Sequence, residues 1–105
     1  MKIRIKGNSL RYRLTRTDVD VFSKNGIRKE QTNFGGNILT YSLECTGTEE
    51  LYATFRDNKI TLYMPYGMAA EFVGTDRVGF EKKTDDFYLL VEKDFLNNGI
   101  LSSLK

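Results

Sequence analysis

The chain opens with MKIRIKGNSLRYRLTRT, residues 1–17, in which apolar and polar side chains alternate on both sides of Gly7-Asn8. Alternation with a period of two predicts β-strands, and a Gly-Asn pair between two such runs predicts a two-residue hairpin turn. The turn also sets the register, because a slip of one residue would move every apolar side chain to the other face. This stretch therefore predicts an antiparallel hairpin and a β-rich fold.

The predicted register of this hairpin places cations opposite cations. Lys2 lies across from Arg13 and Arg4 lies across from Arg11, with Lys6 further along the same face. Like charges directly opposite one another destabilise a strand pair. The hairpin must therefore either receive acidic side chains from neighbouring strands or hold an anionic ligand.

Length and composition indicate one globular domain over residues 1–105. A chain of 105 residues with 40% hydrophobic and 29% charged residues can bury a core and is not globally disordered. We see no apolar run that approaches the roughly 18 residues of a membrane span, and no signal peptide at the start. The single cysteine excludes an intrachain disulfide. We therefore expect a cytoplasmic protein.

The charge is distributed unevenly along the chain. The net charge is only +2, so the protein is not a bulk polycation. Residues 1–17 hold six cations and no acid, whereas the remainder holds 10 cations and 14 acids. The two parts should attract each other, which favours docking of the basic hairpin on acidic strands.

The rest of the chain alternates between helix and strand patterns. Thr15 with Asp18 forms a capping box, and Asn25-Gly26 ends a helix at about 16–24. A second short helix is predicted over 67–73. Residues 96–105 have a weak pattern that fits an extra strand, a helical turn or a frayed tail, and we see no internal repeat. The six further predicted strands are 27–34, 38–45, 51–56, 59–64, 77–83 and 87–93.

These elements predict an α+β fold, mainly an antiparallel β meander of about eight short strands with two short helices. Long alternation means that one sheet face is buried and the other faces water. Pairing of 51–56 with 59–64, for example, places Phe55 and Ile60 inside. Either a strongly curved sheet or a partly closed barrel fits this pattern.

Several kinds of chemistry are excluded by the residues present. The chain has no histidine, which removes the commonest general base and a cysteine-histidine zinc site. No glycine-rich phosphate loop is present. Cys45 follows Leu43 on the apolar face of its strand, where a free cysteine is typically a small buried hydrophobe. We therefore predict no catalytic residue, no metal and no cofactor.

The polar face of the predicted sheet is the remaining candidate site. Arginine forks bind phosphate or carboxylate groups, and tyrosine hydroxyls orient a ligand. A concave face would form a cationic groove edged by tyrosines and acids. The candidate ligand-binding residues are Lys2, Arg4, Arg11, Arg13, Tyr52, Tyr63, Tyr88, Glu81 and Glu92.

These residues support more than one function. The cations could form loose surface pairs with Glu44, Glu81 and Glu92, each worth about 0–1 kcal/mol. The leading hypothesis is a binding domain for an anionic, phosphate-bearing ligand such as a metabolite, a nucleotide or an RNA backbone, although no RNA-recognition motif is present. The alternative is a protein-interaction module or a homodimer that meets an acidic patch. An enzyme would need metal-assisted phosphate chemistry through Glu81 and Glu92.

The opening MKIRIKGNSLRYRLT, the capped helix, the glycine-rich hairpin and a late VEKDF resemble a small family of uncharacterised bacterial proteins. The resemblance covers about residues 1–95. Members of that family often continue with a cysteine-bearing acidic tail, whereas Phe95 is followed here by LNNGILSSLK. The family has no assigned activity, so the resemblance implies no catalytic residue.

Overall fold

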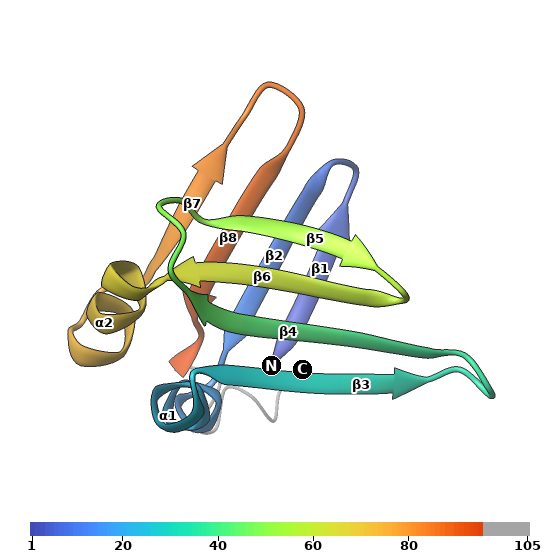
Figure 1. Ribbon diagram of the computed structural model, residues 1–105, viewed down its shortest axis with the longest axis horizontal. Coiled ribbons are helices and arrows are strands. Elements are labelled where there is room, and N and C mark those ends of the chain that lie inside the picture. The colour runs from blue at the N-terminus through green and yellow to red at the C-terminus, as the bar shows by residue number, and fades with distance from the viewer. Residues whose placement is uncertain (96–105) are drawn as a thin grey trace.

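The fold was obtained as a computed structural model that describes residues 1–95. It confirms an α+β protein with eight strands and two short helices in that part of the chain (Figure 1). The prediction for residues 96–105 lies outside the described residues. In chain order, the elements are β1 (Lys2–Lys6), β2 (Ser9–Leu14), α1 (Arg16–Asn25), β3 (Ile27–Asn33), β4 (Ile38–Thr46), β5 (Tyr52–Arg56), β6 (Lys59–Pro65), α2 (Tyr66–Gly74), β7 (Gly79–Lys83) and β8 (Tyr88–Lys93).

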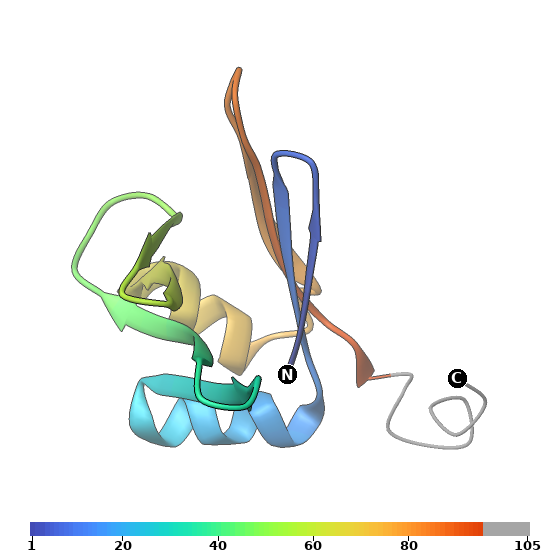
Figure 2. The same ribbon diagram turned by 90° about the vertical axis from the view of Figure 1, so that its right-hand side faces the viewer.

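The strands form two four-stranded sheets and not one curved sheet or barrel (Figures 1 and 2). The first sheet has the order β1-β2-β8-β7 and the second has the order β3-β4-β6-β5. Each hairpin is antiparallel, but β2 pairs with β8 in parallel and β4 pairs with β6 in parallel. The sheets are therefore mixed, because α1 and α2 each carry the chain from one sheet to the other.

The topology contains an internal repeat, contrary to the expectation from the sequence. The series β1-β2-α1-β3-β4 is followed by the series β5-β6-α2-β7-β8. Equivalent elements start at residues 2 and 52, 9 and 59, 16 and 66, 27 and 79, and 38 and 88. Each half gives its first hairpin to one sheet and its second hairpin to the other, so the halves interlock. When residues 2–45 are aligned with residues 52–95 at a constant offset of 50, the only identical pairs are Asn8/Asn58, Phe22/Phe72 and Leu39/Leu89.

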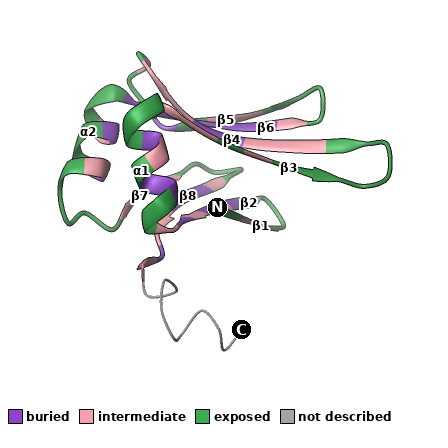
Figure 3. Cartoon of the chain, turned by 90° about the horizontal axis from the view of Figure 1, so that it is seen from below, coloured by how far each residue is buried: buried purple, intermediate pink, exposed green. Residues whose placement is uncertain are grey.

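The core lies between the inner faces of the two sheets. Tyr12 of β2 is fully buried, and its hydroxyl donates a hydrogen bond to the Ile60 carbonyl of β6 at 3.2 Å. The two helices add the equivalent side chains Phe22 and Phe72, which are 2% and 0% exposed. Figure 3 shows both helices at one end of the strands, with the β1–β2, β3–β4 and β5–β6 turns at the other end.

The local signals for the first helix are confirmed. The Thr15 hydroxyl accepts a hydrogen bond from the Asp18 amide, and the Thr15 amide donates to the Asp18 carboxylate. Gly26 ends α1 with a φ of 72°, a conformation that suits glycine. The second helix starts after Pro65 without a side-chain cap. Neither helix in residues 1–95 has the length and apolar character needed to cross a membrane.

Two apolar strand residues are not buried: Phe55, which was predicted inside, and Ile5 on the apolar face of the first hairpin. The registers confirm that Ile5 pairs with Leu10 and that Phe55 pairs with Ile60. Ile5 and Phe55 are nevertheless 61% and 68% exposed. They lie beside the turns, at the end of the strands that the helices leave uncovered (Figures 1 and 3). Cys45, predicted to be buried, is only half-buried at the end of β4.

Candidate functional site

Most of the predicted site residues share the outer face of the first sheet. The register of β1, β2, β8 and β7 arranges this face in three rows. We call it the cationic face; its rows are Lys2, Arg13, Glu92 and Gly79, then Arg4, Arg11, Leu90 and Glu81, then Lys6, Ser9, Tyr88 and Lys83.

The predicted tyrosines Tyr52 and Tyr63 lie elsewhere. They belong to β5 and β6 of the second sheet, and their rings stack with centroids 4.6 Å apart. Tyr63 neighbours the fully buried Leu62, so the two tyrosines lie on the outer face of their sheet. The inner faces of the sheets pack together, so these rings point away from the cationic face. The structure therefore does not bring Tyr52 and Tyr63 together with the arginines.

Two of the predicted arginines have acidic partners. Arg11 donates from Nε and Nη2 to Oε2 of Glu92, at 3.0 and 2.6 Å. Arg13 Nη2 lies 3.1 Å from Oδ2 of Asp94. Both carboxylates come from β8 or the residue after it, which pairs in parallel with β2. These pairs account for the attraction expected between the basic hairpin and the acidic strands.

The three cations of β1 have no such partners. Lys2, Arg4 and Lys6 are exposed, and none of them forms an ion pair within residues 1–95. The strand β1 is at the edge of its sheet. Cations on an edge strand oppose pairing with a strand of another chain. They also leave positive charge available to a ligand, because Arg4 lies directly opposite Arg11.

A hollow of about 330 Å³ lies on the cationic face. Arg4, Lys6, Arg11 and Tyr88 supply its polar lining, together with Ser9. The Tyr88 hydroxyl donates a hydrogen bond to Oε2 of Glu81 at 2.6 Å. This hydrogen bond raises the pKa of Tyr88, so the phenol stays neutral at physiological pH. The hollow can therefore offer three cationic groups to a ligand, while the Tyr88 and Ser9 hydroxyls already donate to Glu81 and to the Lys6 carbonyl.

The acids on this face are engaged by neighbouring side chains. Glu92 accepts hydrogen bonds from Arg11, and Glu81 accepts one from Tyr88. Glu44 lies on the second sheet, where its carboxylate binds Lys59 at 3.0 Å. In the part of the chain that the structure describes, no three potential metal ligands cluster.

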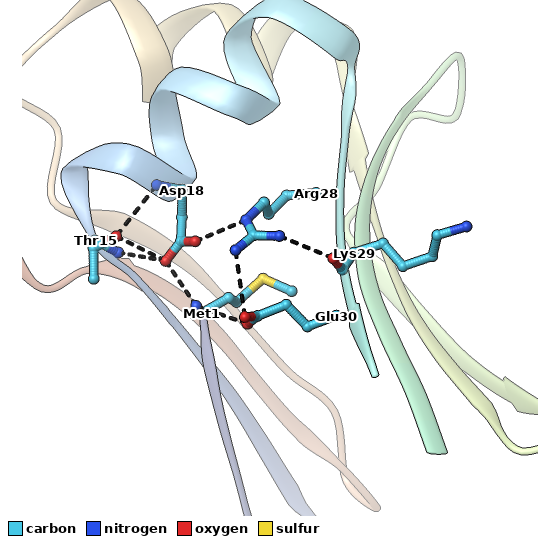
Figure 4. Close-up of polar contacts among 6 residues, drawn as sticks. All are labelled: Met1, Thr15, Asp18, Arg28, Lys29 and Glu30. Atoms are coloured by element: carbon cyan, nitrogen blue, oxygen red, sulfur yellow. Dashed lines mark hydrogen bonds and ion pairs between the residues drawn. The ribbon is translucent and has the colours of Figure 1, made fainter. Parts of the chain in front are cut away.

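A partly buried ionic cluster anchors the start of β1 (Figure 4). The sequence signals did not predict it. The Met1 ammonium lies 2.8 Å from Oδ2 of Asp18 and 2.8 Å from Oε2 of Glu30. Arg28 Nε lies 2.7 Å from Oδ1 of Asp18, and its Nη2 lies 3.4 Å from Oε1 of Glu30. The cluster joins β1, α1 and β3, and it therefore ties the two sheets together.

Asp18 is the centre of this cluster and is 2% exposed. Burial by itself would raise the pKa of Asp18. Hydrogen bonds from the Met1 ammonium, the Thr15 amide, Arg28 and the Thr15 hydroxyl outweigh burial and lower the pKa to about 2. The sequence predicted Asp18 only as a helix cap. Its contact with Arg28 could not be predicted, because Arg28 and Glu30 lie on β3, whose position relative to α1 depends on tertiary packing.

A second hollow, of about 460 Å³, is lined by residues beside the β1–β2 and β5–β6 turns. These turns lie at the end of the sheets opposite the helices (Figure 3). We call it the apolar groove. Sequence alternation assigned its apolar strand residues to the core, but Ile5 and Phe55 are exposed at this uncovered end. Its lining residues are Ile5, Gly7, Asn8, Ser9, Leu10, Leu39, Ala53, Thr54, Phe55, Ile60 and Phe87.

Comparison with known proteins agrees with the resemblance seen in the sequence. No functionally curated protein matches the chain. A family model does match, over residues 1–97, which include all eight strands and both helices of the described part. The chain therefore belongs to the family of unknown function DUF7009.

Proposed function

We propose that this protein is a small binding domain that holds an anionic, phosphate-bearing ligand on the cationic face. One observation carries the proposal. Arg4, Lys6 and Arg11 line the same 330 Å³ hollow, and Arg4 and Lys6 have no acidic partner among the described residues. An anionic ligand would supply the negative charge that these two side chains lack.

The chemistry of the three side chains suits a phosphate group. A guanidinium presents N–H groups in a fixed fork that matches phosphate or carboxylate oxygens, and a lysine adds a point charge. Arg11 is already held by Glu92 through Nε and Nη2. Such a preorganised side chain loses less conformational freedom when a ligand binds. Arg4, directly opposite on β1, can approach the same ligand.

The arrangement favours a small molecule over a nucleic acid. Binding of single-stranded nucleic acid relies on aromatic rings that stack bases along a positive groove. The stacked pair Tyr52 and Tyr63 is on the other sheet, away from Arg4 and Arg11. The size of the hollow, about 330 Å³, falls at the lower end of small-molecule sites.

The half-buried free thiol of Cys45 suits a reducing compartment, and we propose a cytoplasmic location.

Thermal shift measurements with inorganic phosphate, pyrophosphate, nucleotides and neutral sugars test this function. A specific site predicts a rise in melting temperature that grows with ligand concentration and persists at moderate salt. Arg4→Gln should weaken binding about tenfold or more, as the loss of a charge-assisted hydrogen bond implies. Lys29→Gln, an exposed cation on the second sheet, is the matched control. Equal small shifts for all polyanions that vanish with salt would refute the proposal.

A second candidate function is assembly with a protein partner or a second copy. The observation that favours it is an apolar tip on the β3–β4 hairpin, where Phe34 and Ile38 are 69% and 43% exposed. Sedimentation equilibrium over a range of concentrations tests self-assembly. We expect a concentration-dependent mass that Phe34→Ser, or charge reversal of Arg4 and Arg13, reduces. A monomer at all concentrations would exclude self-assembly.

A further inference from the structure

The apolar groove is a second surface feature that the proposed anion site does not explain. Two of its largest side chains, Ile5 and Phe55, are 61% and 68% exposed. A contiguous apolar surface of this kind on a small protein marks a binding site, because its exposure to water is otherwise unfavourable. The volume of about 460 Å³ lies within the range of ligand pockets.

The walls of the groove come from equivalent positions in the two halves of the chain. Ile5 and Leu10 are paired on β1 and β2 of the first sheet. Phe55 and Ile60 are paired on β5 and β6 of the second sheet. The groove therefore runs between two apolar hairpins. A long, narrow apolar group would contact both walls at once.

The polar groups in the groove are largely satisfied by the protein. The Asn8 side-chain amide donates a hydrogen bond to the Asp86 carbonyl at 3.0 Å, and the Ser9 hydroxyl donates one to the Lys6 carbonyl at 2.6 Å. A peptide or a sugar buried here would leave many of its own polar groups without partners, which is costly. An aliphatic chain has no such groups, so it is the chemistry that the lining favours.

The groove adjoins positive charge. Ser9 and Leu10 line both the apolar groove and the hollow on the cationic face. Lys6 and Arg56 directly follow the groove residues Ile5 and Phe55 on the same strands; both are exposed, and their side chains lie on the outer faces of the sheets, across the strand from the groove. Neither forms an ion pair within residues 1–95. A ligand with its apolar part in the groove would therefore find cations for an anionic end.

We infer that the ligand is an anionic amphiphile: a single aliphatic chain lies in the apolar groove, and a phosphate monoester end binds at Lys6 and Arg4. This inference rests on the proposed function, since it names the substrate class of the same anion site. The ligand passes around the Gly7-Asn8 turn, beside Ser9 and Leu10, which border both hollows. The amphiphile binds as a single molecule and not as part of a bilayer.

Titration calorimetry with inorganic phosphate and with butyl, octyl and dodecyl phosphate tests the inference, each alkyl phosphate below its micellar concentration and at moderate salt. Burial of an aliphatic chain predicts that the dissociation constant falls by about fourfold for each added methylene until the groove is filled. Arg4→Gln and Lys6→Gln should weaken binding of every probe. Inorganic phosphate should bind to the wild type with the weakest affinity of the series.

Groove variants separate the two parts of the site. Ile5→Ser and Phe55→Ser change exposed side chains, so both variants should fold. They should flatten the dependence on chain length and leave the affinity for inorganic phosphate unchanged. Val78→Ser is the matched control, since Val78 is 64% exposed and lies outside the groove. It should behave as the wild type does.

The remaining outcomes overturn the inference in distinguishable ways. Phosphate binding that is independent of chain length would overturn it and leave the proposed function standing. No binding of any probe would overturn both. Binding only to anionic vesicles would replace a monomeric ligand with a membrane surface. Self-association that Phe55→Ser abolishes would show that a second copy occupies the groove.

Discussion

Neutralising Asp18 should remove a defined part of the stability of this protein. Asp18 is buried, and its carboxylate receives hydrogen bonds from the Met1 ammonium, Thr15 and Arg28. These contacts lower its pKa from 3.8 to about 2. That difference corresponds to about 2 kcal/mol of folding free energy, because a group with a lower pKa in the folded state favours folding when ionised.

The pH dependence of this contribution has a definite sign. The folded-state pKa lies below the unfolded one, so the contribution is fully present above the unfolded value of 3.8. It is lost as the pH falls through the folded-state value of about 2. Asp18→Asn should therefore lower the unfolding free energy by about 2–3 kcal/mol at pH 7. The difference from the wild type should shrink between pH 4 and pH 2.

Urea denaturation at pH 2, 3, 4, 5 and 7, followed by far-ultraviolet circular dichroism, measures this difference. Asp20→Asn is the control, because Asp20 is exposed on the same helix and forms no ion pair in the described residues. It should change stability by less than about 0.5 kcal/mol at each pH. A difference between Asp18→Asn and the wild type that stays constant from pH 7 to pH 2 would refute the electrostatic argument.

Three further predictions concern a buried hydrogen bond, two glycines and the cysteine thiol. Tyr12→Phe should destabilise the protein by about 0.5–1.5 kcal/mol in urea denaturation, since it removes the buried hydrogen bond from the Tyr12 hydroxyl to the Ile60 carbonyl of β6. An unchanged midpoint would contradict this. Gly79→Ala should unfold β7 or lower the melting temperature, because a Cβ there would collide with the backbone of β8. Gly67→Ala in α2 has open space around it and should instead stabilise the helix by up to about 1 kcal/mol. Burial raises the pKa of the Cys45 thiol, so Cys45 should react with iodoacetamide more slowly in the folded protein than in urea. Mass spectrometry measures the two rates, and equal rates would contradict the burial.

Local signals account for the parts of the fold that were predicted well. Gly7 has a φ of 53° in the first hairpin turn, and Asp57 and Asn58 have φ values of 51° and 62° in the equivalent turn of the second half. Two-residue turns with positive φ fix the register of the strands they join. The capping box of Thr15 fixes the start of α1 in the same way. Each of these depends on residues that are close in the chain.

The candidate site was predictable only in part, for the same reason. The hairpin turn places Arg4 opposite Arg11, and the structure confirms this register. The partner of Arg11, however, is Glu92 of β8, far along the chain. A parallel pairing of that kind requires no turn and leaves no sequence signal. The assumption of one continuous polar face also placed Tyr52 beside the arginines, although the chain changes sheets at α1 before reaching it.

The sequence by itself determined the number and the approximate bounds of the strands and helices, the two hairpin registers set by tight turns, and the excess of cations on β1. Only the tertiary structure decided that the strands form two sheets from interlocked halves. The repeat is not visible in the sequence because equivalent positions keep an apolar character while their residues differ, as at Leu10/Ile60 and Leu14/Met64. The tertiary structure also creates the apolar groove, which lies between the two sheets where no helix covers them. Alternation shows which side chains share a face, but burial depends on what the distant part of the chain places over that face.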